Sequence, residues 1–208
     1  MMQPIEPFLL ESPYVDFSAG NIQAKAADLF NGILDGTQKA RIAYAFVRDK
    51  IPHSFDIGAA VITAKASDVL KHETGICHAK ANLLAALLRS QKIPCGFCFQ
   101  HITLKDNDSA GYCVHCYNAV WLEGRWIKLD ARGNKPGVCA EFSLDEPMLA
   151  FPCRVEYNEY FWPGIYAAPH IETMRMLEQA KSLQEVFDNI PNTITNEPDI
   201  TEQESMGL

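Results

Sequence analysis

Residues 74–97, TGICHAKANLLAALLRSQKIPCGF, decide the fold class of this chain. The segment from Cys77 to Ser90 is rich in Ala and Leu, which are strong helix formers, and it predicts an α-helix. Leu84, Leu87 and Leu88 give that helix a face that can be buried. From Pro94 onward the pattern changes to that of a β-strand, so the predicted helix is followed by a predicted strand.

Strands follow this helix. The segments CGFCFQHITL (95–104), YCVHCYNAVWL (112–122) and RWIKLDA (125–131) each predict a strand, because they are short, apolar and bounded by turn residues. Glu123-Gly124 predicts a tight turn between the last two strands. These neighbouring strands are therefore expected to run antiparallel.

Helices dominate the part of the chain before residue 77. Periodicity and capping residues indicate five segments outside the strands. They are a helix over 22–34 capped by Asn21, a helix over 38–50 capped by Thr37, extended chain over 51–57, a short helix over 66–72 and a last helix over 171–189. Helices first and antiparallel strands afterwards predict an α+β fold.

Composition limits the classes of function. The 208 residues carry a formal net charge of −8 and no long Lys/Arg cluster, which disfavours nucleic acid and an anionic membrane surface as partners. The N-terminus lacks the features of a signal peptide, and no run of about 18 apolar residues is present, so a cytoplasmic location is expected. Seven cysteines, an odd number, favour reduced thiols. We expect one domain over 1–190 and an acidic, disordered tail over 191–208.

Cys77 occupies a chemically favourable position at the start of the predicted helix. The first N–H groups of a helix have no partner within it, and the helix dipole is positive there. Both effects favour a thiolate, so Cys77 is a candidate nucleophile. The alternative is a small apolar residue that only packs in the core.

His115 and Asp130 lie on the two strands joined by Glu123-Gly124. If those two residues are the whole turn, Trp121 faces Trp126 and His115 becomes a diagonal neighbour of Asp130 on one face. A thiolate needs a base, and the base needs an orienting partner, which these two side chains would supply. A three-residue loop would put them on opposite faces, and each residue would then have a local structural role.

Three ordered segments resemble the transglutaminase-like superfamily, a group of papain-like cysteine enzymes. They are TGICHAKANLLAALLRSQKIPCGF, VHCYNAVWLEG (114–124) and RWIKLDARG (125–133), preceded by FVRDKIPHSFDI (46–57). The resemblance covers roughly residues 40–138. It implies a papain-like core in which the nucleophile helix packs on an antiparallel sheet.

The resemblance also implies roles for three residues. Cys77 matches the family's nucleophile, His115 its base and Asp130 its orienting acid. The implied chemistry is acyl transfer from an amide or peptide bond of a protein, peptide or amide substrate, without a metal or other cofactor. The large cross-linking members carry extra β domains, so this shorter chain is expected to be a peptidase or amidase, with transglutaminase activity as the alternative. His53 and Gln100 are candidates for the family's second oxyanion donor, and a structural role is the alternative for each.

Two further interpretations compete with this one. Cys95 and Cys98, followed by Cys113 and Cys116, have a spacing close to that of a zinc ribbon. Because residues three apart on a strand point to opposite faces, a metal would require a turn within each pair, for which Gly96 is the only suggestion. The other interpretation is a catalytically inactive binding module on the same fold.

Overall fold

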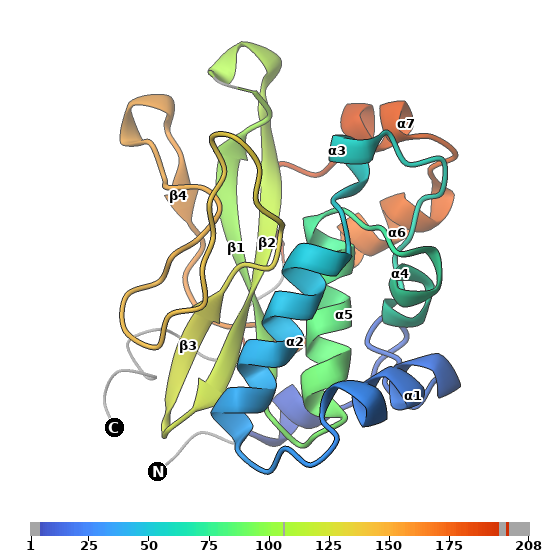
Figure 1. Cartoon of the computed structure of the whole chain (residues 1–208). Coiled ribbons are helices and arrows are strands. Elements are labelled where there is room, and N and C mark those ends of the chain that lie inside the picture. Colours follow the sequence, from blue (N-terminus) through green and yellow to red (C-terminus); the bar gives the residue numbers. More distant parts are fainter. Residues whose placement is uncertain (1–4, 106, 196–198, 200–208) are drawn as a thin grey trace.

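The computed structural model of the chain describes residues 5–105, 107–195 and 199, and it has the α+β architecture that the sequence predicts (Figure 1). A twisted sheet forms one side, and the helices gather beside it around α5. The α-helices are α1 (Gly20–Leu29), α2 (Gly36–Lys50), α3 (Ser54–Ile57), α4 (Ala66–His72), α5 (Cys77–Arg89), α6 (Ile171–Gln179) and α7 (Leu183–Asn189). The strands are β1 (Cys95–Thr103), β2 (Tyr112–Leu122), β3 (Arg125–Leu129) and β4 (Tyr160–Phe161), and three short 3-10 helices are η1 (Glu6–Leu9), η2 (Asp108–Ala110) and η3 (Val155–Tyr157).

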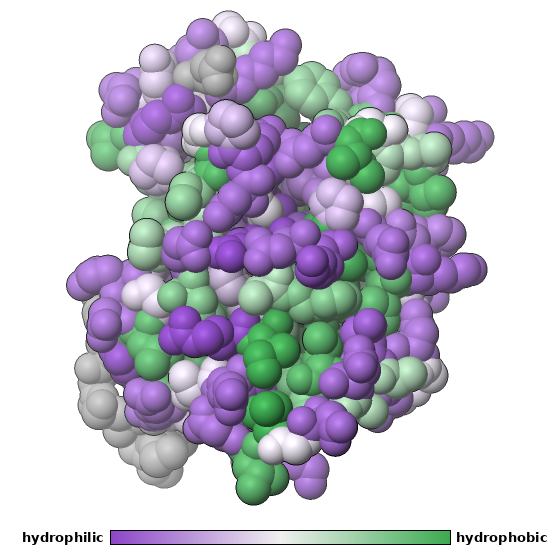
Figure 2. Space-filling view, in the orientation of Figure 1, coloured by the Kyte–Doolittle hydropathy of each residue, from purple (hydrophilic) through white to green (hydrophobic). Residues whose placement is uncertain are grey.

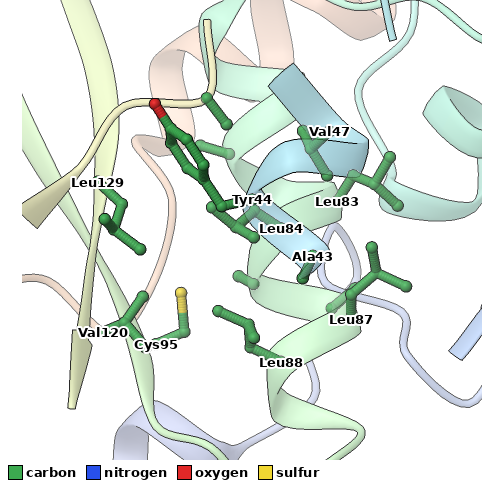
Figure 3. Packing of buried hydrophobic residues seen from close by; sticks show 14 of the residues in the cluster. Ala43, Tyr44, Val47, Leu83, Leu84, Leu87, Leu88, Cys95, Val120 and Leu129 are labelled. Atoms are coloured by element: carbon green, nitrogen blue, oxygen red, sulfur yellow. The ribbon is translucent and has the colours of Figure 1, made fainter. Parts of the chain in front are cut away.

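The helix α5 lies at the centre of the molecule. Every one of its residues is buried, as expected of a helix that other elements surround. Figure 3 shows Leu83 and Leu87 of α5 against Ala43 and Val47 of α2, with strand residues such as Val120 on the other side. Each fully buried aliphatic side chain of this kind contributes about 1.5–3 kcal/mol, so the position of Cys77 at the first turn of α5 is firmly determined.

The sheet has the order β3-β2-β1-β4, and its pairs are antiparallel. Trp121 pairs with Trp126, as a two-residue turn requires, and their rings lie 5.5 Å apart. The turn residues Glu123 and Gly124 have φ angles of 52° and 79°. Two positive φ angles match the right-handed twist of a hairpin, so the predicted two-residue turn is confirmed.

The cysteine pairs proposed as zinc ligands are part of regular strands. Cys95 and Cys98 lie in β1, Cys113 and Cys116 lie in β2, and the two strands pair without interruption. Gly96 makes no turn, and a side chain there would come within 2.5 Å of Ile165. Within the described part of the chain, no group of three or more His, Cys, Asp or Glu side chains is arranged to hold a metal ion.

Two predicted helix starts and one predicted extended segment differ from the structure. α1 begins after Ala19 rather than at an Asn21 cap, and it ends at Leu29, earlier than predicted. Asp35, not Thr37, caps α2, because its side chain accepts a hydrogen bond from Gln38 N at 2.6 Å. Within 51–57, only the first residues are extended, and residues 54–57 form the single helical turn α3.

The C-terminal region also differs from its prediction. The helix predicted over 171–189 is two helices, α6 and α7, because Ala180 is extended (ψ 134°) and Ser182 caps α7 by accepting a hydrogen bond from Glu185 N. The segment 160–170, for which the sequence predicts no element, contributes the two-residue strand β4 to the sheet edge.

The described residues beyond 190 contact the body of the protein. Pro191 O accepts a hydrogen bond from Val114 N at 2.8 Å, and Asp199 N donates to Ile165 O at 3.1 Å. The rest of the predicted disordered tail lies outside the described residues, and the domain boundary at residue 190 stays a prediction. No helix in the described ranges is long and apolar enough to cross a membrane.

Candidate active site

Cys77 is the first residue of α5, and the residue is 9% exposed at the end of a buried helix. β3 pairs only with residues 118–122 of β2, which leaves the preceding part of β2 next to the start of α5. There His78 Nε2 lies 2.8 Å from Val114 O, and Cys116 N donates to the Cys77 sulfur. The edge of β2 therefore supplies a backbone donor for the thiolate that is not evident from the sequence.

His115 and Asp130 meet as the hairpin register predicts. Asp130 directly follows β3, and the pairing of Asn118 with Leu129 makes it a diagonal neighbour of His115. His115 Nε2 lies 2.8 Å from Asp130 Oδ2, and the two side chains are 2% and 1% exposed. Since Nε2 is engaged by Asp130, Nδ1 is the ring nitrogen available to Cys77, with which His115 also forms a hydrogen bond.

Asp130 is fixed by the backbone on both of its oxygens. Oδ1 accepts a hydrogen bond from Arg132 N at 3.0 Å, and Oδ2 accepts one from Ala150 N at 3.0 Å. Burial alone would raise the pKa of Asp130, but His115 and these two N–H donors lower it overall. The carboxylate is therefore ionised and can act only as an acceptor toward His115.

Cys77 and His115 stabilise each other's charged forms. Burial opposes ionisation of the thiol, yet the pKa of Cys77 is lowered overall because the charge and hydrogen bond of His115 and the Cys116 N–H outweigh burial. Burial likewise opposes the imidazolium, but Asp130 and the thiolate raise the pKa of His115 to about 10. The arrangement thus favours a thiolate–imidazolium pair at neutral pH.

A cluster of charged side chains braces the loop that follows Asp130. Arg132 is 6% exposed and forms two hydrogen bonds with Asp56 of α3, one of them 3.0 Å between Nη2 and Oδ1. Lys135 Nζ lies 2.6 Å from Asp56 Oδ1. These donors lower the pKa of Asp56 to about 2 although partial burial opposes it. The cluster therefore connects the loop that carries Asp130 to the segment that carries His53. Arg132 and Asp56 are 76 residues apart in the sequence, and no local sequence pattern predicts their contact.

His53 and Gln100, the two candidates for an oxyanion donor, lie in different surroundings. His53 Nε2 accepts a hydrogen bond from the backbone N of Cys77 at 3.1 Å. Gln100 pairs with His115 across β1 and β2, but its Nε2 donates to Phe151 O at 2.8 Å and contacts Cys153 Sγ at 3.5 Å. Of these two candidates, therefore, only His53 contacts the backbone N–H of Cys77.

Lys80 is buried one helical turn after Cys77, a position that no sequence pattern singled out. Its Nζ donates to Ile51 O and lies 3.5 Å from Arg48 O, at the C-terminal end of α2. Burial, reinforced by the charge of Arg132, lowers the pKa of Lys80 to about 7. The sequence feature that could have identified Lys80 is its place inside an Ala/Leu-rich helix that is expected to be buried. Lysine is almost never fully buried without a specific partner, so such a position indicates one.

The depressed pKa of Lys80 predicts a pH-dependent stability. Between pH 7 and about 10.5 the unfolded chain binds the Lys80 proton more tightly than the folded protein does, so stability rises with pH in that window. The free energy of unfolding of the wild type, relative to that of Lys80→Met, should rise by about 2 kcal/mol from pH 7 to pH 9. Urea unfolding at the two pH values measures it. The exposed Lys71→Met is the control, and equal pH dependence of the wild type and Lys80→Met would contradict the prediction.

The family of the chain follows from comparison with known proteins. The profile of the Transglutaminase-like superfamily matches residues 23–131, more than half of the chain, and this range includes α5 and all of β1, β2 and β3. A comparison with curated proteins finds no match.

One similar solved structure is that of a candidate cysteine protease from Cytophaga hutchinsonii, with 24% identity and a TM-score of 0.49. The alignment covers 62% of this chain and 42% of that protein, so the activity of that protein is not assigned to this chain. The family profile and the α+β fold agree with the resemblance of the three sequence segments. The chain belongs to the transglutaminase-like superfamily.

Proposed function

We propose that this chain is a thiol acyl-transfer enzyme with Cys77 as nucleophile, His115 as general base and acid, and Asp130 as the acid that orients His115. The observation that carries the proposal is the 2.8 Å contact between His115 Nε2 and Asp130 Oδ2, made while His115 also bonds to Cys77. A nucleophile bonded to a base that a third group orients is the arrangement that activates a thiol for acyl transfer.

The first half of the reaction forms a thioester. The Cys77 thiolate attacks the carbonyl carbon of an amide or peptide bond, and the carbonyl oxygen becomes an oxyanion. The C–N bond then breaks, and the leaving amine takes its proton from the His115 imidazolium. Asp130 stabilises the imidazolium while that proton is still present and fixes which ring nitrogen faces Cys77.

The second half releases the acyl group to an acceptor. His115, now neutral, takes a proton from water, whose oxygen attacks the thioester, and the C–S bond breaks to return the thiolate. We propose water rather than a protein amine as the acceptor, so that the enzyme is a peptidase or amidase. The small exposed fraction of Cys77 supports this choice, because water is the smallest acceptor that can reach a thioester there.

Peptide amides that release a fluorescent aminocoumarin test this proposal. The wild type should release the fluorophore from members of a peptide panel, and Cys77→Ala should release none above background. The same reaction with an excess of cadaverine separates the two acceptors, because mass spectrometry identifies the acyl product as an acid or as the cadaverine amide. A predominant acid product is expected.

Other products would change the assignment. A predominant cadaverine amide would make the chain a transglutaminase with the same three residues. No fluorophore release and no acyl group on Cys77 would contradict the enzyme proposal and leave the inactive binding module. The far-ultraviolet circular dichroism of Cys77→Ala serves as the folding control.

A further inference from the structure

The helical turn α3 turns its polar side chains toward the protein and its apolar side chains toward solvent. Ser54 is 2% exposed, and the Asp56 carboxylate forms two hydrogen bonds with the buried Arg132. Phe55 and Ile57, in contrast, are exposed. A surface helix ordinarily places its apolar residues against the core, so the packing of α3 does not account for the position of these two side chains.

Phe55 is separated from the proposed nucleophile by a single imidazole. Its ring stacks on the ring of His53, with the centroids 6.0 Å apart and the planes inclined by 27°. His53 Nε2 in turn accepts a hydrogen bond from the backbone N of Cys77 at 3.1 Å. The exposed apolar surface of α3 therefore begins within one side-chain length of the site.

The position of His115 indicates which part of a substrate would lie on α3. The leaving amine takes its proton from His115, so it has to leave on the His115 side of Cys77. His115 contacts the sulfur of Cys77, whereas α3 is connected to its backbone N–H through His53. The part of the substrate that stays on the sulfur as the acyl group is thus directed toward α3.

The apolar surface around Phe55 is short and ends at charged groups. Phe187 of α7, the helix next to α3 in Figure 1, meets the Phe55 ring edge-on at a centroid distance of 6.4 Å. Beyond it, the ammonium group of Lys105 lies 5.8 Å from the centroid of the Phe187 ring. On α3 itself, the ion pair of Asp56 with Arg132 stands between the two apolar residues in sequence. A surface of this extent fits one amino-acid side chain, because a long hydrocarbon chain would have to cover charged groups and remove them from water.

We propose that the substrate is a peptide with a large apolar side chain, such as that of leucine, on the residue whose carbonyl Cys77 attacks, and that Phe55 and Ile57 bind this side chain. The inference rests on the proposed function of Cys77 and adds the substrate class to it. Binding removes the apolar surface of both partners from water, which is favourable. It also holds the carbonyl carbon beside the thiolate in the orientation that the reaction needs.

Activated esters of acetylated amino acids measure this preference at Cys77. The p-nitrophenyl esters of N-acetylleucine and N-acetylglycine each acylate a thiolate and release p-nitrophenolate, and their reaction with free N-acetylcysteine gives their intrinsic reactivities. Relative to that reference, the wild type should prefer the leucine ester by about 10-fold, the gain expected for a leucine side chain that is about half covered. Peptide mass spectrometry locates the acyl group, and Cys77→Ala gives the background.

Substitutions on α3 test where the preference arises. Phe55→Ser should lower the preference for the leucine ester to about 2-fold, and Phe55→Leu should retain most of it. Ile57→Ser should also lower it, and this variant serves the test if Phe55→Ser does not fold. Leu34→Ser is the matched control, because Leu34 is 94% exposed in the connection between α1 and α2, and its preference should equal that of the wild type.

Three results would overturn the inference. One is a wild type with no preference beyond that of N-acetylcysteine, and another is a preference that persists in both Phe55→Ser and Ile57→Ser. The third is an equal fall in Phe55→Ser of the rates with both esters and of the alkylation of Cys77 by iodoacetamide, since Phe55 would then only position His53. In each of these cases Cys77 remains a reactive nucleophile, so the proposed function stands.

Two further results have a different meaning. If p-nitrophenyl decanoate, relative to N-acetylcysteine, acylates the wild type faster than the leucine ester does and loses this advantage in Phe55→Ser, α3 binds a fatty acyl chain and the peptide substrate is wrong. If neither ester acylates wild-type Cys77 and iodoacetamide labels it no faster than the exposed Cys139, the proposed function fails, and this inference fails with it.

Discussion

Replacing His115 by alanine is expected to slow the alkylation of Cys77 by iodoacetamide at pH 6 by about 100-fold. In the wild type the imidazolium of His115 and its hydrogen bond lower the pKa of the Cys77 thiol against the effect of burial. Without His115, burial remains and favours the neutral thiol. A thiol with a pKa near 9 is only about 0.1% ionised at pH 6, and its greater intrinsic nucleophilicity offsets part of that loss.

Peptide mass spectrometry after limiting alkylation between pH 5 and pH 9 measures this effect. Cys139 is exposed and serves as the internal reference, because its labelling should not change in His115→Ala. The buried Cys95 and Cys113, whose pKa values burial raises to about 12, should label far more slowly than Cys77. Labelling of wild-type Cys77 no faster than that of Cys139 would show that no activated thiolate exists, and would favour the inactive binding module.

Changing Asp130 to asparagine is expected to lower kcat for amide hydrolysis by about 1,000-fold or more. An asparagine can turn its NH₂ group toward His115, which would then present the wrong tautomer to Cys77. The variant also loses the charge that raises the pKa of His115 to about 10. The proton that the leaving amine needs is lost as pH rises through the pKa of His115, so the alkaline limit of activity should move to lower pH.

A pH–rate profile of the variant separates this effect from simple destabilisation. Asp145→Asn is a matched control, since Asp145 is 93% exposed and only 4.0 Å from Arg125 at the surface. Its kcat and its alkaline limit should equal those of the wild type. If Asp130→Asn retained wild-type kcat with an unshifted alkaline limit, Asp130 would not be the residue that orients His115.

The surface near the start of α5 has an apolar part as well. Phe55 and Ile57 of α3 are 39% and 55% exposed, and Figure 2 shows apolar surface at the position of α3 among hydrophilic residues. Both residues lie within four positions of His53, so a substrate that contacts them would also approach the candidate site.

Local signals in the sequence predict much of the secondary structure of this protein and the register of its hairpin. The Ala/Leu-rich composition of 77–90 predicts α5, and two turn residues between apolar strands predict the hairpin register. The proximity of His115 and Asp130 follows from that register, because both residues belong to one hairpin and the side-chain period of a strand is two. Signals of this kind act over a few residues, so a single sequence contains them.

Helix ends and the last helix are predicted less well. Asp35 and Thr37 are both good capping residues two positions apart, and the structure has Asp35 as the cap. The break between α6 and α7 has no Gly or Pro to signal it. In these places several local structures have similar free energies, and tertiary contacts choose among them.

The surroundings of Cys77 depend on the tertiary structure alone. The Cys116 N–H that reaches its sulfur, the imidazole of His53 at its backbone and the ion pair of Arg132 with Asp56 join segments far apart in the chain. Local patterns in the sequence identify the residues that we propose to carry the chemistry, and they predict the hairpin that aligns two of them. The neighbours that shift the pKa values of these residues follow only from the tertiary structure. Burial and hydrogen bonding depend on how α3, α5 and β2 pack together, and no residue spacing along the chain predicts that packing.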